Sequence, residues 1–270
     1  MEDAGSRSAQ SNLRGWLSDV YMPALVAGEC RQLARRLGDR ATVDDPLFGR
    51  ASGSAAVLVE LEKLQGWLAK HGASFVKTAF VMGPNRDVTE GTLSATFDGR
   101  TTVVPLAVVS ERHRERAVDL RIYYATRALR PEPAIRPPLL VTEDETAVPP
   151  PLESYLDSLQ RGDIAGAVAS FEEGAVLRDA AGVIHVKQRG AGPLWAYHAK
   201  LLGGATGASA SALIVKNARA DDGRTCALEY TVTRIRGRDV PPQAGFAVFE
   251  RSESGLLKAM RVYDDIGVAD

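Results

Sequence analysis

Apolar side chains recur at helical spacing where each half of the chain begins. In the second half they fall at i, i+3, i+4 and i+7, the spacing of an amphipathic helix, and these positions are Leu152, Tyr155, Leu156 and Leu159. Gly162 is expected to end this helix, and Asp163 is expected to cap the next one with its side-chain oxygen. The pattern therefore predicts two consecutive short helices.

Alternating apolar and polar positions follow these helices, which is the pattern of half-buried strands. The alternation is clear at Leu228, Tyr230 and Val232. The expected strands cover residues 175–177, 211–218, 225–236, 243–252 and 256–264. A third helix is expected between the first two of these strands, with Leu194 and His198 on its inward face.

The first half shows the same order of elements. Apolar stripes predict its first and third helices, at Trp16, Leu17, Val20 and Tyr21 and at Val57, Leu61, Leu64 and Leu68. Its strands are expected near residues 74–82, 90–98, 101–111 and 117–126. Helices followed by an antiparallel meander predict an α+β fold, in which a curved sheet wraps around about three packed helices and encloses a cavity.

The two halves also repeat each other residue by residue. Tyr21 corresponds to Tyr155 and Asp45 to Asp179, each pair lying 134 positions apart. Near the ends of the halves the offset is 140, and the aligned pairs are Ala107 with Ala247, Arg121 with Arg261, and Tyr123 with Tyr263. Surface loops tolerate the extra residues between these points. Repetition over this length predicts two similar domains rather than a solenoid.

A proline-rich segment separates the repeats. Half of the 14 prolines lie between residues 131 and 151, and proline removes a backbone donor, so neither a helix nor a central strand is expected there. We expect a disordered tail over residues 1–12, a first domain over 13–130, an extended linker over 131–150 and a second domain over 151–270. The tail lacks the apolar core of a secretory signal.

Composition excludes several classes of function. Of the 270 residues, 45% are hydrophobic and 25% charged, with a net charge of -1, so no attraction to nucleic acid or to a membrane is expected. No apolar run reaches the about 18 residues of a membrane span. Cys30 and Cys226 show no metal-ligand or redox spacing and fit a reducing cytoplasm. No phosphate loop, metal motif or serine-hydrolase elbow is present, so neither a cofactor nor a metal is expected.

The tyrosine and aspartate pairs resemble a known pattern. Tyr21 with Asp45, and Tyr155 with Asp179, are similar to the pattern of bacterial ketosteroid isomerases, which belong to the nuclear transport factor 2-like (SnoaL-like) superfamily. The segment ATVDDP around Asp45 is a close match, LRDAAG around Asp179 is a looser one, and the ending RVYDD resembles the close of SnoaL-like domains. The resemblance covers both halves and implies two cone-shaped domains, each with a closed pocket.

The resemblance also implies roles for these four residues. Asp45 and Asp179 would move a proton, and Tyr21 and Tyr155 would donate a hydrogen bond to the substrate oxygen. Burial in an apolar pocket raises the pKa of a carboxyl group toward that of a useful general base. A tyrosine hydroxyl aimed at a carbonyl stabilises the enolate that forms when the neighbouring carbon loses its proton.

One departure from the isomerase pattern limits the expected reaction. Those isomerases use a protonated aspartate on a late strand as a second donor, and the aligned residues here are Ala107 and Ala247. Losing such a donor typically costs about a hundredfold in rate, so steroid isomerisation itself is not expected. Other acids and bases serve the cyclases and epoxide hydrolases of the superfamily. The further pocket candidates of this kind are His198, Glu90, Glu229 and Asp264.

Two functions stay open at this point. The first is a cofactor-independent acid/base enzyme, an isomerase, cyclase or hydrolase, acting on a small hydrophobic substrate such as a polyketide-like molecule. The second is a non-catalytic module of the same fold that binds a small molecule or a protein. The orientation of the carboxylates discriminates between them, since turn aspartates and core tyrosines are common without catalysis.

Three structural expectations accompany these functions. The halves are expected to pair as an intramolecular pseudo-dimer, and further homo-oligomers remain open. Arg121 and Arg261 are expected in structural ion pairs. Glu229 alternates with threonines on a polar strand face, which favours a solvent-facing side chain.

Overall fold

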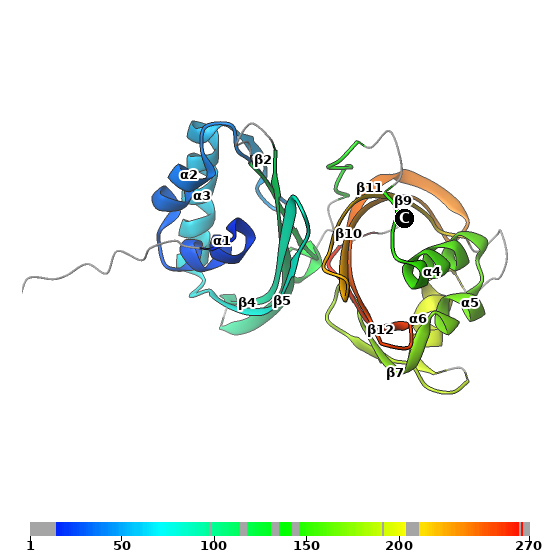
Figure 1. Ribbon diagram of the computed structural model, residues 1–270. Helices are drawn as coiled ribbons and strands as arrows, with labels where there is room; N and C mark the ends of the chain where they lie inside the picture. The colour runs from blue at the N-terminus through cyan, green and yellow to red at the C-terminus, as the bar shows by residue number, and fades with distance from the viewer. Residues whose placement is uncertain are drawn as a thin grey trace, which may run out of the picture.

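The computed structural model describes residues 15–97, 99–113, 118–130, 135–141, 146–190, 192–203, 211–264 and 266. Within them the chain forms two units of the same construction, each a six-stranded sheet with helices against one face (Figure 1). Three parts of the chain that are named above lie outside the described residues, namely the tail 1–12, residues 131–134 and 142–145 of the linker, and Asp265 of the RVYDD ending.

The first domain runs from α1 to a 3-10 turn. Its elements are α1 (Leu17–Val26), α2 (Cys30–Leu37), β1 (Thr42–Asp45), β2 (Gly49–Ser52), α3 (Ser54–Lys70), β3 (Ser74–Met82), β4 (Arg86–Phe97), β5 (Arg100–Arg112), β6 (Val118–Tyr124) and η1 (Thr126–Ala128). The strand order is β2-β1-β6-β5-β4-β3. Only the β1–β6 pair among these neighbours is parallel.

The second domain repeats this plan. Its elements are α4 (Pro150–Arg161), α5 (Ile164–Ala169), β7 (Phe171–Arg178), β8 (Ile184–Val186), α6 (Pro193–Leu201), β9 (Leu213–Asp221), β10 (Thr225–Ile235), β11 (Arg238–Arg251) and β12 (Leu257–Val262). The order β8-β7-β12-β11-β10-β9 is that of the first sheet. Two α+β domains of equal topology are therefore confirmed. None of the helices described is long and apolar enough to cross a membrane.

Local sequence signals set the helix ends in the second domain. Gly162 follows α4 with a φ of 66°, a left-handed conformation that glycine adopts without steric cost. The Asp163 carboxylate accepts a hydrogen bond of 2.8 Å from the Gly166 backbone N–H and so caps α5. Both ends are confirmed as the sequence predicts them.

The late strands are aligned differently from the sequence expectation. Strand pairing places Glu90 opposite Ala107 and Glu229 opposite Phe246, so Ala107 corresponds to Phe246 and not to Ala247. Ala107 belongs to the cluster between the two domains, whereas Ala247 belongs to the second domain's own core. The predicted Ala107–Ala247 pairing is wrong by one residue, and a shift of one residue turns a side chain to the opposite face of a sheet.

The two sheets lie face to face, and the helices cover their outer sides (Figure 1). Each domain has its own apolar core between helices and sheet. A third cluster joins the sheets, and its members are Val81, Val88, Ala107, Val109, Tyr123, Ala220, Ala227, Phe246, Val248 and Tyr263. The Tyr123 and Phe246 rings stack at 4.7 Å. The chain thus has four layers, helix, sheet, sheet and helix.

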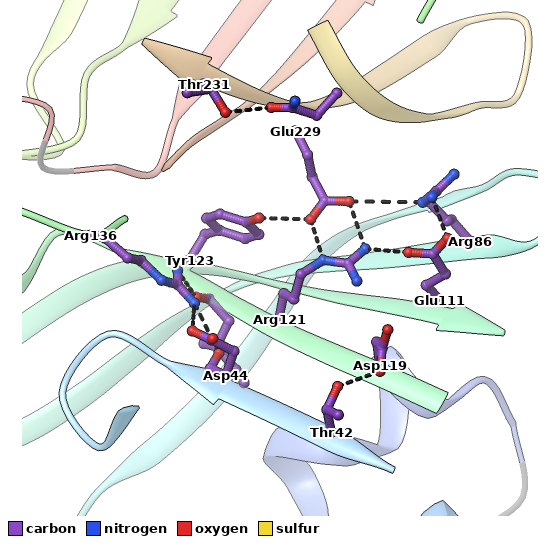
Figure 2. Close-up of polar contacts among 12 residues, drawn as sticks. Thr42, Asp44, Arg86, Glu111, Asp119, Arg121, Tyr123, Arg136, Glu229 and Thr231 are labelled. Carbon is purple, nitrogen blue, oxygen red and sulfur yellow. Dashed lines mark hydrogen bonds and ion pairs between the residues drawn. The ribbon is translucent and has the colours of Figure 1, made fainter. Parts of the chain in front are cut away.

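Equivalent ion pairs join the two sheets in both directions, each between an arginine and a tyrosine of one domain and a glutamate of the other. The Glu229 carboxylate accepts hydrogen bonds of 2.5 and 2.8 Å from Arg121 and of 2.7 Å from the Tyr123 hydroxyl (Figure 2). In the reverse direction, Glu90 accepts bonds of 2.6 and 2.8 Å from Arg261 and another from the Tyr263 hydroxyl.

These contacts settle two sequence expectations. The structural ion pairs expected for Arg121 and Arg261 are confirmed. The solvent-facing position favoured for Glu229 is wrong. The first domain packs against the polar face of the second sheet, so Glu229 is only 3% exposed.

The segment that connects the domains is held by both of them. Arg136 donates to the Asp44 carboxylate at 2.6 Å and to the Ile122 carbonyl at 2.6 Å, both in the first domain (Figure 2). Its own carbonyl accepts from the Ala244 backbone N–H of the second domain at 2.9 Å. The guanidinium also lies over the Tyr123 ring, 4.8 Å from its centre. This part of the connection therefore reinforces the contact between the sheets.

Candidate functional site

A cavity of about 1080 Å³ opens into the second domain. Its walls come from α4, α6 and the inner face of the sheet, and they are mainly apolar, with Leu156, Val232 and Phe249 among them. Residues of the first domain complete one side, namely Val103, Val104, Pro105, Ala125, Arg127 and Ala128. A mainly apolar cavity with a few polar groups is typical of a small-molecule site.

A carboxylate and an imidazole form a pair in this cavity. Asp179, directly after β7, accepts bonds on Oδ1 from the backbone N–H groups of Ala181 and Val183, at 3.0 and 2.9 Å. Its Oδ2 lies 3.0 Å from Nε2 of His185 on β8. A carboxylate accepts, so Nε2 carries the hydrogen of this bond, and in the neutral form of the ring Nδ1 is the nitrogen with the lone pair. The tight turn between β7 and β8 brings the two side chains together.

Tyr197 on α6 stands beside this pair. Its ring centre is 4.9 Å from that of His185, and both residues line the cavity. Burial raises the pKa of the Tyr197 hydroxyl, and the negative charges of Asp264 and Asp179 raise it further. Among the described residues no hydrogen bond to this hydroxyl is found. Tyr197 is therefore a protonated donor whose hydrogen remains available to a ligand.

Two other tyrosines of the cavity wall are already hydrogen-bonded. The Tyr230 hydroxyl donates to Oδ2 of Asp264 at 2.7 Å, and the Phe246 backbone N–H donates to the same oxygen at 2.9 Å. The Tyr155 hydroxyl lies 3.1 Å from Nε2 of the buried His198.

The tautomer of His198 decides the direction of that last bond. Its Nδ1 lies 2.8 Å from the Leu194 carbonyl, which can only accept, so Nδ1 carries the hydrogen and Nε2 accepts from Tyr155. Burial lowers the pKa of His198 to about 4. His198 is thus a neutral residue that holds Tyr155 from behind, and it does not itself line the cavity.

The corresponding residues of the first domain are sealed in its core. Tyr21 is 0% exposed and Asp45 is 4% exposed, and neither lines the large cavity. Asp45 Oδ1 accepts from the Tyr124 hydroxyl at 2.7 Å and from the Leu47 and Phe48 backbone N–H groups. Burial raises the pKa of the Asp45 carboxyl against the effect of these bonds.

The Tyr21 hydroxyl is buried and has no hydrogen-bond partner among the described residues. Burial raises its pKa, and the charge of nearby Asp45 adds to the effect. The first domain therefore brings a phenol and a carboxylate near each other, as the sequence suggests, but no described cavity reaches them.

The remaining predicted residues fall in different places. Asp264 and Tyr155 line the large cavity, together with Asp179. Glu90 and Glu229 lie on the opposite face of their sheets, where they bind Arg261 and Arg121 between the domains. Their positions serve the domain contact and not the cavity.

The sequence interpretation missed His185, Tyr197 and Tyr230. The signal for His185 was its place on a short segment six residues after Asp179, which a tight turn folds back onto the aspartate. Tyr197 directly precedes His198 on α6. Adjacent helical residues point in different directions, so Tyr197 lines the cavity while His198 is buried behind it.

One group of potential metal ligands lies elsewhere, at Glu111, His113 and Asp119 of the first domain. The Glu111 carboxylate pairs with Arg86 and, at 2.8 Å, with Arg121. Thr42 and His113 both bond Asp119. Two guanidinium groups beside the carboxylate oppose a cation, so these residues do not fit a metal site.

Comparison with known proteins identifies relatives by structure alone. No family model and no curated protein matches the chain. A Delta 5-3-ketosteroid isomerase from Mycobacterium sp. is 17% identical, with 42% of this chain and 92% of that chain covered and a TM-score of 0.34. A Mycobacterium tuberculosis protein in complex with estradiol-17beta-hemisuccinate is 15% identical, with 40% and 90% covered and a TM-score of 0.34.

A putative polyketide cyclase from Sinorhizobium meliloti is 16% identical, with 39% of this chain and 92% of that chain covered and a TM-score of 0.32. Each match spans the length of one of the two domains.

Proposed function

We propose that the second domain binds a small apolar molecule in its cavity and catalyses proton transfer on it without a cofactor. The observation that carries this proposal is the cavity of about 1080 Å³ lined by Asp179, His185 and Tyr197. These side chains combine a proton acceptor, a group that orients it and a hydrogen-bond donor within a mainly apolar space. An isomerase or cyclase acting on a carbonyl compound fits this set.

The roles of the three side chains follow from their hydrogen bonds. Both oxygens of Asp179 are occupied by protein donors, so Asp179 orients His185 and stabilises its protonated form. Nδ1 of His185 takes a proton from the carbon next to the carbonyl group. The electron pair of that C–H bond forms a carbon–carbon double bond, and the π pair of the carbonyl group moves to its oxygen, which Tyr197 stabilises by donating a hydrogen bond. In a β,γ-unsaturated carbonyl compound, return of the proton from His185 to the γ-carbon yields the conjugated isomer.

This assignment moves the expected base from Asp179 to His185. It also moves the expected donor from Tyr155 to Tyr197, because the Tyr155 hydroxyl already donates to His198. The sealed Tyr21 and Asp45 have no part in the reaction. The first domain instead supports the second by closing one side of its cavity.

We further propose that the domains act as an intramolecular pseudo-dimer. Matching contacts in both directions support it, with Arg121 and Tyr123 binding Glu229 and with Arg261 and Tyr263 binding Glu90. Covalent linkage keeps each domain at a high effective concentration for the other.

A non-catalytic ligand-binding function is the second candidate. The observation that favours it is the internal pairing of two of the polar groups in the cavity, with Tyr155 bonded to His198 and Tyr230 bonded to Asp264. Under this function the polar groups position a ligand and move no proton.

Hydrogen exchange on a small ketone tests the choice between the two candidates. The probe is 2-tetralone, an apolar bicyclic ketone, and the measurement is the loss of its α-proton signal in D₂O by NMR. The intact chain should accelerate exchange above the buffer rate. His185→Ala and Tyr197→Phe should each lower the rate by about a hundredfold, as expected for a general base and an oxyanion donor.

His71→Ala is the matched control, since His71 lies at the end of α3 in the first domain and lines no described cavity. This variant should exchange the probe at the rate of the parent chain. Exchange that survives His185→Ala would remove the catalytic assignment. Binding of the probe without any exchange would select the non-catalytic function.

A further inference from the structure

Three cationic side chains line the rim of the cavity. They are Arg127 of η1 in the first domain, Lys200 of α6 and Arg236 of the β10–β11 turn. All three are exposed, so they stand where the cavity meets solvent. We propose that the ligand of this cavity is an apolar molecule with a single anionic group, such as a carboxylate, which these cations hold at the rim. The inference rests on the ligand-binding function proposed above.

The acids and the cations of the cavity have different partners. Its acids are Asp179 and Asp264, which accept hydrogen bonds from His185 and from Tyr230 respectively. No ion pair joins Lys200 or Arg236 to a carboxylate within the part of the chain that the structure describes. Lys200 and Arg236 are therefore not neutralised by the acids of the cavity, and they favour an anion that approaches from solvent.

The backbone at Arg236 supports a role for its side chain. Arg236 has a φ of 53° and Gly237 a φ of 69°, and the two residues form the loop between the paired Ile235 and Arg238. Two positive φ angles define a type I′ turn, where asparagine, aspartate or glycine is preferred at the first position. Arginine is strained there, and such strain persists mainly where function requires the side chain.

Arg236 and Lys200 occupy the same side of the rim. A Cβ atom added at Gly203, just after α6, would lie 3.3 Å from Cβ and Cγ of Arg236. The Gly203 backbone N–H in turn donates to the Lys200 carbonyl at 3.2 Å. The stem of Arg236 therefore packs on the end of the helix that carries Lys200. A carboxylate between the two cations would contact both a guanidinium and an ammonium group.

Arg127 makes the rim a feature of both domains. It belongs to the short turn that follows β6, and its neighbours Ala125 and Ala128 line the same cavity. The anion site thus gives the first domain a function that its own sealed Tyr21 and Asp45 do not provide.

A pair of fluorescent probes tests the inference. 1-Anilinonaphthalene-8-sulfonate and N-phenyl-1-naphthylamine share one aromatic body, and only the former carries an anionic group. In the full chain at low ionic strength, Lys200→Glu combined with Arg236→Glu should raise the Kd of the sulfonate probe by about tenfold. The Kd of the neutral probe should change by less than about twofold. Arg127→Glu should also raise the Kd of the sulfonate probe while leaving the Kd of the neutral probe nearly unchanged.

The matched control is the double variant Arg238→Glu with Lys258→Glu. It reverses the charge at two exposed positions of the same domain that do not line the cavity. It should leave both Kd values unchanged. Equal effects of the rim variant and the control would overturn the anion site, while binding of the neutral probe would still support the apolar cavity.

Occupation of the cavity by the neutral probe has its own check. Ala196→Trp adds a large ring to a lining position of α6, and it should weaken the neutral probe by about tenfold or more. Ala56→Trp, at an exposed position on α3, should not. Failure of the neutral probe to bind, or binding that ignores Ala196→Trp, would overturn the proposed ligand-binding function and the anion site together.

Discussion

Equivalent tyrosines have opposite hydrogen-bond states in the two domains. The Tyr155 hydroxyl donates to His198, whereas the buried Tyr21 hydroxyl finds no partner in the part of the chain that the structure describes. An unsatisfied buried hydroxyl destabilises the folded state, and a hydrogen-bonded one stabilises it by about 1 kcal/mol. The pair therefore offers a comparison of a hydrogen-bonded and an unsatisfied buried hydroxyl at equivalent positions.

Removal of each hydroxyl should therefore have opposite consequences for stability. Tyr21→Phe should leave the free energy of unfolding unchanged or raise it by up to about 1 kcal/mol. Tyr155→Phe should lower it by about 1–2 kcal/mol, because Nε2 of His198 loses its donor. Urea unfolding measures both values. A larger loss for Tyr21→Phe than for Tyr155→Phe would contradict the described contacts.

His198 should make the protein sensitive to mild acid. Burial lowers its pKa to about 4 in the folded state, against about 6.5 in an unfolded chain. Between these values the unfolded state binds more protons, so stability falls as the pH drops through this window. Between pH 7.5 and pH 5 the contribution of His198 to the free energy of unfolding should decrease by about 2 kcal/mol.

The matched variant for this effect is His198→Gln, which cannot take up a proton in this range. The difference in unfolding free energy between the parent chain and the variant should shrink by that amount over the same pH interval. A difference independent of pH would show that His198 is not held neutral by burial.

At the scale of elements, glycine on β11 decides where a cavity tyrosine lies. Gly245 is paired with Tyr230 on β10, and a Cβ atom at Gly245 would lie 2.0 Å from Cε2 of that ring. The ring thus covers the glycine, and its hydroxyl reaches Asp264 at the cavity wall. A side chain at this position must displace the ring.

Gly245→Ala should consequently lower the free energy of unfolding by about 1–3 kcal/mol, the usual cost of overpacking. It should also weaken binding of N-phenyl-1-naphthylamine, because Tyr230 lines the cavity. Gly66→Ala is the control, since it lies within α3 with no atom within 4 Å of the added Cβ. That variant should gain up to about 1 kcal/mol. Equal thermal stability of the two variants would refute the packing of Tyr230.

Elements were more predictable from the sequence than the site. Amphipathic stripes and the Gly162–Asp163 stop-and-cap signal identify the helices because burial of one face and capping act locally. The alignment of β5 with its equivalent in the second repeat, β11, was not predictable in this way. An apolar run such as that around Ala107 and Ala247 has no polar residue to mark which face is inward.

The candidate site was predictable only in part for a similar reason. Asp179 and Tyr155 follow from the resemblance and do line the cavity. His185 lies on a strand of three residues, which is too short for alternation to reveal it. The buried role of Glu229 depends on the second sheet meeting the first, and no local pattern encodes a contact between domains.

At the scale of the whole molecule, buried ion pairs hold the two sheets together. Glu229→Leu leaves Arg121 buried with Glu111 as its remaining carboxylate partner, and it should cost about 3–5 kcal/mol. The double variant Glu229→Leu with Arg121→Met should cost less than the sum of the single variants, because it leaves neither charge unpaired. Chemical denaturation of the four proteins gives the coupling.

The exposed pair Arg31–Glu62, 3.3 Å apart, serves as the comparison. Its removal should change the unfolding free energy by less than about 1 kcal/mol. If Glu229→Leu were as mild as loss of this exposed pair, the ion pairs would not be what holds the sheets together.

Among the described residues, the cavity to which we assign function lies in the second domain and is completed by the first. The most direct test is the stoichiometry of N-phenyl-1-naphthylamine binding to the full chain, measured by titration at a protein concentration well above Kd. One molecule should bind per chain, and this binding should be lost in Ala196→Trp and retained in Ala56→Trp. Two molecules per chain, or one that persists in Ala196→Trp, would contradict it.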